Sequence, residues 1–182
     1  MENIISKEQL NTARGDARLF SALLNESRVA LERRAYSYEV TVFLSHYHGE
    51  GVVLENVISE LRRLGVSVYV DWNDSGMPTN TSGLTAMRIK EKIRSSKKFI
   101  LLATEAAIAS KWCNWELGFG DACRFPTDIA IMPIKESRNQ MFSGSEYLQI
   151  YPIITNEYQY SIGNYYVEFR GNKITLAEWL KK

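Results

Sequence analysis

The segment SKWCNWELGFGDACRF, residues 110–125, places the carboxylate of Glu116 within a stretch that is otherwise suited to an amphipathic helix. At about 100° per residue, one face of this helix is predicted to form an apolar stripe. Its members are Trp112, Trp115, Phe119, Ala122 and Cys123. Glu116 lies at the margin of the stripe, where a rigidly held carboxylate can stabilise a neighbouring positive charge. The alternative is a helix-edge glutamate that reaches solvent or pairs with a lysine.

Further candidate residues follow two predicted strands. Ser45 ends the β-rich run YEVTVFLS and is followed by His46, and Trp72 ends the run VSVYVDW. Each has a purely structural alternative: Ser45 can cap the next segment, His46 can be a satisfied core histidine, and Trp72 can pack at the strand end. No Cys or Asp joins His46 and His48 at ligand spacing, so no metal site is predicted.

Short apolar runs and amphipathic helices alternate through the middle of the chain. Strands are predicted at residues 38–45, 66–72, 98–104 and 128–134, and helices at 52–65, 84–95 and from 111 onward. This alternation indicates an α/β fold with a central parallel sheet, helices on both faces and right-handed crossovers. Because ligands in such folds bind at the carboxyl ends of the strands, residues 45–50, 72–83 and 104–111 are expected to border the site.

The two ends of the chain depart from this alternation. Residues 1–36 are predicted to form an N-terminal helical extension, which leaves residues 37–182 as the domain. The C-terminal part is expected to form a strand, a tyrosine-rich hairpin that turns near Gly163 and Asn164, and a final helix from Thr175 to Lys182.

Composition limits the kind of partner. The net charge is +1 and no block of five like charges occurs, so neither nucleic acid nor an anionic membrane is an expected partner. Cys113 and Cys123 would lie about 15 Å apart along one helix, too far for a disulfide, which suits a reducing cytoplasm. No signal peptide, transmembrane run, P-loop or Rossmann glycine pattern is visible, so the expectation is a soluble cytoplasmic protein.

The chain resembles Toll/interleukin-1 receptor (TIR) domains, especially bacterial members that cleave NAD. The resemblance covers residues 39–134 and rests on VFLSH, on VYVDW with the long loop after it, on SSKKFILLAT, and on SKWCNWELG with its W-x-x-x-E pattern. It implies a flavodoxin-like fold in which Glu116 is the catalytic glutamate. Trp112 and Trp72 would then offer aromatic walls, and Ser45 and His46 would border the pocket from the first strand.

The resemblance also implies a reaction and partners. NAD+ would be a substrate rather than a cofactor, and would yield nicotinamide with ADP-ribose or a cyclic isomer. One ionised glutamate suffices for this step, because neutral nicotinamide leaves a ribosyl cation behind. Self-association through TIR domains is expected, as is a separately encoded effector reached through the product, as in Thoeris antiphage defence. The alternatives are a catalytically silent TIR scaffold and a transferase that cleaves other N-glycosidic bonds.

Overall fold

The alternating pattern of the sequence corresponds to alternating strands and helices in the fold. The computed structural model describes residues 4–7, 10, 40–71, 83–124, 126–136, 144–156 and 165–182. The strands are β1 Ile5–Ser6, β2 Thr41–Ser45, β3 Ser67–Tyr69, β4 Lys98–Ala103, β5 Ile129–Lys135, β6 Ile153–Asn156, β7 Tyr165–Phe169 and β8 Asn172–Thr175. The α-helices are α3 Gly51–Arg63, α4 Gly83–Ser95, α5 Glu105–Ala109, α6 Lys111–Cys123 and α7 Leu176–Lys181. Two short 3₁₀ helices, η2 Pro126–Asp128 and η3 Glu146–Ile150, precede β5 and β6.

The strands form one sheet in the order β3-β2-β4-β5-β6-β7-β8, with β1 added beside β5. All pairs from β3 to β6 are parallel, and β6-β7-β8 are antiparallel. Counted from β2 along the chain, the parallel strands follow the spatial order 2-1-3-4-5 of the flavodoxin-like fold. The predicted α/β fold with a central parallel sheet is therefore confirmed. The point where the strand order reverses lies between β2 and β4.

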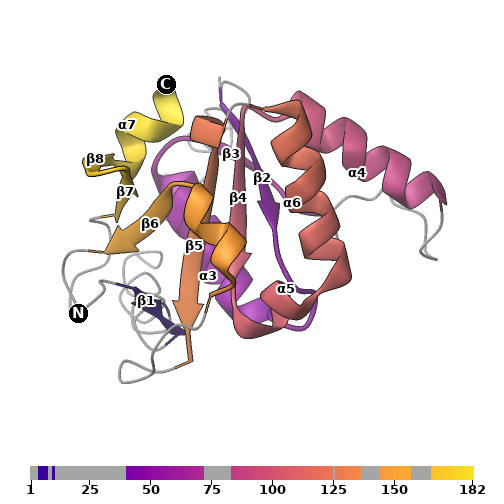
Figure 1. The fold of residues 1–182 in the computed structure, drawn as a ribbon, viewed down its shortest axis with the longest axis horizontal. Helices are drawn as coiled ribbons and strands as arrows, with labels where there is room; N and C mark the ends of the chain where they lie inside the picture. The colour runs from indigo at the N-terminus through magenta and orange to yellow at the C-terminus, as the bar shows by residue number, and fades with distance from the viewer. Residues whose placement is uncertain are drawn as a thin grey trace, which may run out of the picture.

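Both faces of the sheet are covered, because side chains alternate across each strand. One core joins α3 and α7 to Val42, Leu44, Ile100 and Leu102, and the other joins α4, α5 and α6 to Phe43, Phe99 and Leu101. In Figure 1, α4, α5 and α6 lie in front of the sheet and α3 lies behind it. The arrows of β2 and β5 point toward the same edge, which also carries α5. This carboxyl edge is where a ligand is expected.

The C-terminal region contains the predicted strand and final helix. Strands β6 and β7 pair in antiparallel fashion, and the expected turn near Gly163 and Asn164 lies outside the described residues. A second hairpin, β7–β8, was not predicted. It turns at Arg170 and Gly171, whose φ angles are 49° and 79°, and glycine adopts that conformation without steric cost. Thr175 then starts α7 with a complete capping box.

The N-terminal residues include a strand where a helix was predicted. Ile5–Ser6 pairs in parallel with the end of β5, and Lys7 binds Glu136 at 2.7 Å and lies 3.5 Å from Glu50. The helical prediction is wrong at Ile5–Ser6, because the free end of β5 offers backbone partners that a helix would leave unused. Residues 11–39 lie outside the described part of the chain, so the division at residue 36 stays a prediction.

A buried lysine joins the opposite edge of the sheet to the C-terminal helix. Lys98 is 2% exposed, forms an ion pair with Asp128, and lies 4.8 Å from the ring centre of Trp179. The indole Nε1 of Trp179 donates to the carbonyl oxygen of Thr127 at 2.7 Å. Because the ammonium has left water, its free energy depends on these neighbours.

We expect Asp128→Asn to destabilise the fold more than Lys98→Met. The first change leaves a buried ammonium without its counter-charge and should cost about 2 kcal/mol. The second replaces a buried charge by an apolar chain of similar length and leaves a carboxylate that is one-third exposed, so its cost should stay below about 1 kcal/mol. Urea unfolding at pH 7 measures both, and an equal or larger loss for Lys98→Met would contradict the argument.

Candidate active site

Glu116 occupies the buried face of α6. The helix begins after Ser110, whose hydroxyl accepts the backbone N–H of Cys113 at 3.4 Å. Its buried residues are Cys113, Glu116, Leu117 and Gly120. The predicted apolar stripe is therefore wrong in phase, and the carboxylate lies in the middle of the buried face rather than at its margin.

The face of α6 that meets the sheet carries Leu117 and two small residues, Cys113 and Gly120. A Cβ on Gly120 would lie 3.2 Å from the ring of Phe99 on β4, so the helix approaches closely only where it is narrow. The bulky side chains lie on the flank beside α4. Trp115 stacks on Phe119 with ring centres 6.2 Å apart, and Lys90 of α4 lies 5.1 Å from the Phe119 ring. Ala122 and Cys123 are exposed.

Ser45 and Glu116 meet at the point where the strand order reverses. Ser45 ends β2, is 1% exposed, and donates its hydroxyl to Oε2 of Glu116 at 2.6 Å. The two residues are 71 positions apart in sequence, and the crossover from β2 through β4 to α6 brings them together. A buried carboxylate that accepts a short hydrogen bond is held in a defined orientation.

Burial favours the protonated, uncharged form of the Glu116 carboxyl. The pKa of its carboxyl is raised from 4.5 to about 7, chiefly by loss of solvation and to a smaller extent by the negative charge of Asp71. The hydrogen bond from Ser45 and the charge of His48 act in the opposite direction. The expectation from the sequence is an ionised glutamate. Near neutral pH the structure instead holds a carboxyl that a nearby cation would readily ionise.

A second cluster of polar side chains consists of Asp71, His46 and His48. The sequence does not predict that these three residues lie together. Asp71, just beyond β3, has its Oδ2 3.0 Å from Nε2 of His48 and its Oδ1 3.8 Å from Nε2 of His46. Nδ1 of His46 lies 3.1 Å from the carbonyl oxygen of Leu44, and Cys113 donates its thiol to the carbonyl oxygen of His46 at 3.2 Å. Because β2 and β3 are neighbours, an acidic residue after β3 must lie near the loop after β2, which is the signal that identifies Asp71.

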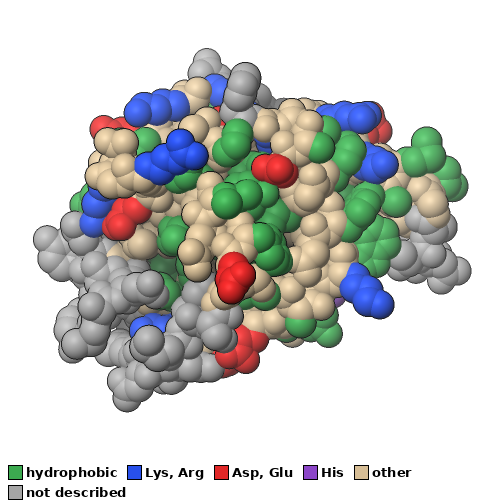
Figure 2. Space-filling view, in the orientation of Figure 1, with side chains coloured by type: hydrophobic (Ala, Val, Ile, Leu, Met, Phe, Trp, Pro, Cys, Tyr) green, Lys and Arg blue, Asp and Glu red, His purple; other side chains and the backbone are tan. Residues whose placement is uncertain are grey.

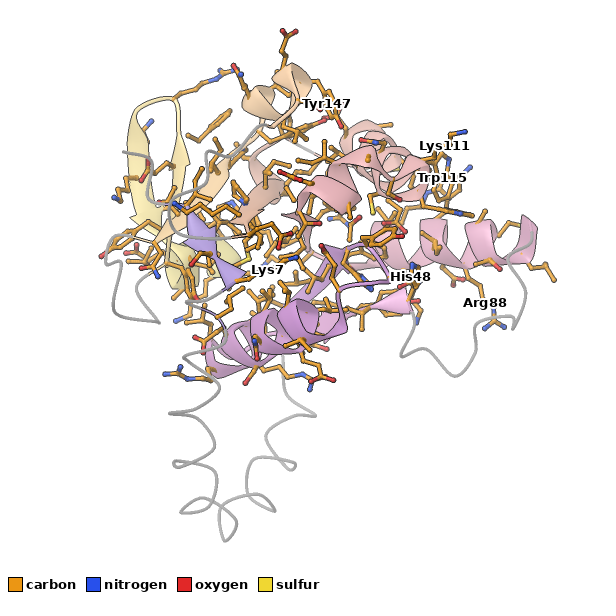
Figure 3. All side chains as sticks on the ribbon, turned by 90° about the horizontal axis from the view of Figure 1, so that it is seen from below. Lys7, His48, Arg88, Lys111, Trp115 and Tyr147 are labelled. Atoms are coloured by element: carbon orange, nitrogen blue, oxygen red, sulfur yellow. The ribbon has the colours of Figure 1, made fainter. Side chains whose placement is uncertain are left out.

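The remaining predicted site residues differ in their surroundings. His46 is 5% exposed, and burial lowers the pKa of its imidazole. Trp112 is 38% exposed and meets Trp115 edge to face, with ring centres 5.2 Å apart. Trp72 lies outside the described residues. The structure thus brings Ser45 to Glu116, places His46 against Asp71 and Cys113, and leaves Trp112 accessible on the same helix as Glu116. Figure 3 views the molecule from below and labels His48 and Trp115.

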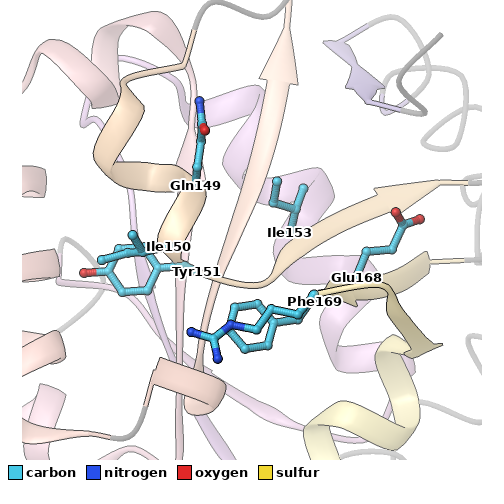
Figure 4. Close-up of a pocket in the computed structure, with 7 residues that line it drawn as sticks. Gln149, Ile150, Tyr151, Ile153, Glu168 and Phe169 are labelled. Carbon is cyan, nitrogen blue, oxygen red and sulfur yellow. The ribbon is translucent and has the colours of Figure 1, made fainter.

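A cavity of about 430 Å³ lies elsewhere, between η3 and the β6–β7 hairpin. Figure 4 shows its lining, to which none of the residues around Glu116 belongs. Its charged groups are already engaged: Glu168 accepts from Thr155 at 2.9 Å, and Arg170 lies 4.9 Å from the Phe169 ring. No group of three or more His, Cys, Asp or Glu side chains among the described residues is arranged to hold a metal ion. We therefore place the candidate site at Glu116.

The strand order of the sheet and the position of Glu116 at its carboxyl edge together indicate a class of protein. A family model described as "TIR domain" matches residues 42–157, which is more than half of the chain and includes Glu116. The chain belongs to the TIR domain family.

Two relatives make the comparison more specific. The chain is 32% identical over 116 residues to "Probable 3' cyclic ADP-D-ribose synthase ThsB'" of Bacillus cereus (strain MSX-D12), covering 62% of this chain and 59% of that protein. It is 30% identical over 81 residues to "Putative cyclic ADP-D-ribose synthase TIR2" of Cytobacillus dafuensis, covering 43% of this chain and 21% of that protein. The similarity thus spans less than two thirds of either relative.

The helices also bear on membrane insertion. Among the described residues, none of the helices combines the length and the apolar character required to cross a bilayer.

Proposed function

We propose that this TIR domain cleaves the bond between nicotinamide and ribose in NAD+, with Glu116 as the catalytic residue. The observation that carries the proposal is the buried Glu116 carboxyl, oriented by Ser45 at the carboxyl edge of β2 and β4. The printed names of both relatives, as cyclic ADP-ribose synthases, support a reaction on the same class of substrate.

The chemistry suits a carboxyl whose pKa lies at about 7 in the empty site. The bound pyridinium is cationic, and its departure as neutral nicotinamide moves positive charge onto the ribose. A cation beside Glu116 lowers the pKa of the carboxyl, so the ionised form becomes dominant when substrate is present. In a site shielded from water, that negative charge stabilises the ribosyl cation far more than it would in solution.

The other predicted substrate contacts fit different parts of the same site. Ser45 orients the Glu116 carboxylate, and Trp112 offers an accessible indole for stacking against a base. His46, whose side chain is buried, is suited to shaping the pocket floor. A contact from Trp72 remains a prediction from the sequence.

Assembly is part of the proposal. Hydrophobic side chains gather on the face that carries α4 and α6 (Figure 2), and Leu84 and Met87 of α4 are 64% and 67% exposed. Exposed apolar side chains of this kind favour contact with a second copy of the chain. The cleavage product, linear or cyclic ADP-ribose, would then act on a separately encoded effector in antiphage defence.

We expect purified protein to release nicotinamide from NAD+, with a specific activity that rises with protein concentration. The rise follows if neighbouring copies complete the pocket. Chromatography of nicotinamide at protein concentrations from about 1 to 100 times the lowest active one measures it, since a second-order contribution appears as a steeper than linear rate. Turnover independent of concentration in a monomeric protein would refute the assembly requirement.

Absence of nicotinamide at every concentration would instead favour the TIR scaffold, which binds other TIR domains without catalysis. The exposed apolar side chains of α4 are compatible with that alternative as well. The buried Glu116 carboxyl argues against it, because an interaction module gains nothing from a carboxyl held beneath its surface.

A further inference from the structure

The charges of His48 and Asp71 act on the pKa of Glu116, but the cleavage step described above gives the pair that they form no direct role. Nε2 of His48 lies 3.0 Å from Oδ2 of Asp71, and the side chains are 63% and 14% exposed. The other carboxylate oxygen of Asp71 faces His46, whose side chain is 3% exposed. Asp71 is thus held between a buried and an accessible imidazole, at the end of the strand next to β2.

This geometry fixes which nitrogen of His48 can accept a proton. In the neutral ring, the hydrogen bond to Asp71 requires the proton on Nε2, which leaves the lone pair on Nδ1. A carboxylate that orients an imidazole in this way is the arrangement found where histidine acts as a base. His46 is arranged differently, because its Nδ1 lies against the carbonyl of Leu44 and its ring is enclosed.

We propose that His48, oriented by Asp71, accepts the proton of a ribose hydroxyl that captures the ribosyl cation, so that the product is cyclic. This inference rests on the proposed function. The C–N bond breaks and its electron pair leaves with nicotinamide. An oxygen of the second ribose of the same molecule forms the new bond to the anomeric carbon, and its O–H proton moves to Nδ1 of His48. Solvent then removes the proton, which the exposure of the ring allows.

The charges around His48 support a role separate from that of Glu116. The groups that act on it electrostatically include Asp71 and Glu116, both of which raise the pKa of the imidazole, and its ring centre lies 5.4 Å from that of His46. Glu116 and His48 thus act on each other electrostatically, while the hydrogen bond that Glu116 accepts comes from Ser45. Because only the neutral ring accepts a proton, the cyclic fraction of product should rise with pH.

The test compares His48→Gln with Tyr47→Phe, a control on the same exposed loop. Nicotinamide release and the cyclic and linear products are measured separately by chromatography, using NAD+ as the probe. We expect His48→Gln to lower the ratio of cyclic to linear product at least tenfold while nicotinamide release falls less than threefold. Tyr47→Phe should keep the wild-type ratio. Asp71→Asn should move the pH midpoint of the ratio downward, since the charge that raises the pKa of His48 is removed.

Chemical rescue distinguishes a role of His48 in proton transfer from a role in shaping the pocket. Imidazole added to His48→Ala should restore the cyclic fraction, which a merely structural role for His48 would not allow. An unchanged product ratio in His48→Gln, or a wild-type protein that makes only the linear product, would overturn the inference while leaving NAD+ cleavage intact. If His48→Gln loses nicotinamide release while Tyr47→Phe retains it, His48 acts in cleavage and the inference about cyclisation is overturned as well. A wild-type protein that releases no nicotinamide would overturn the proposed function itself.

Discussion

Glu116→Gln is expected to lower nicotinamide release from NAD+ by about 10³-fold or more, and to weaken binding of the cationic substrate by a much smaller factor. The amide keeps the shape of the side chain and can still accept the hydroxyl hydrogen of Ser45. It carries no charge, so the ribosyl cation loses the stabilisation that Glu116 supplies. Such a loss corresponds to about 4 kcal/mol in the activation free energy.

The matched control is Glu105→Gln on α5, which removes an exposed carboxylate from the same edge of the sheet. It should retain nearly full activity, and comparable losses for the two variants would remove Glu116 from the mechanism. Ser45→Ala should be intermediate, because the hydrogen bond from Ser45 lowers the pKa of Glu116. Its loss of activity should therefore shrink as pH is raised from 7 to 9.

The sequence predicts the strands and helices that surround the site better than it predicts which face of α6 meets the sheet. The apolar runs of β4 and β5 are continuous because both faces of these strands are buried, and that signal is local. The proximity of Ser45 and Glu116 follows once the strand order is known. The face of α6 that meets the sheet cannot be read from the sequence of the helix alone, because it depends on the packing of Gly120 against the ring of Phe99 on β4.

Two other features depend on segments that are distant in sequence. The two-residue strand β1 exists because β5 has a free end, which nothing in residues 1–36 reveals. The pair of Asp71 and His48 follows from the adjacency of β2 and β3. The sequence pattern suggests His48 only as a candidate metal ligand, because Asp71 is close to His48 across the sheet and not along the chain.

The raised pKa of Glu116 predicts opposite effects of pH on activity and on stability. Activity needs the carboxylate, so kcat/KM should rise about tenfold per pH unit below about pH 7 and level off above it. Stability follows the reverse course. The folded protein holds this proton more tightly than the unfolded chain, whose carboxyl titrates near 4.5, so the stabilisation is complete below pH 4.5 and is lost as pH rises through about 7.

Glu116→Gln isolates this contribution, because the amide does not titrate while every other group is retained. Between pH 5 and pH 8 the free energy of unfolding of the wild type should fall relative to that of the variant by roughly 2 to 3 kcal/mol, as urea unfolding would measure. A difference that stays constant with pH would mean that Glu116 titrates normally. If the difference grows as expected, the ionised carboxylate destabilises the empty site, and binding a cationic substrate relieves that cost. The same burial that weakens the fold would then be what makes Glu116 effective against a ribosyl cation.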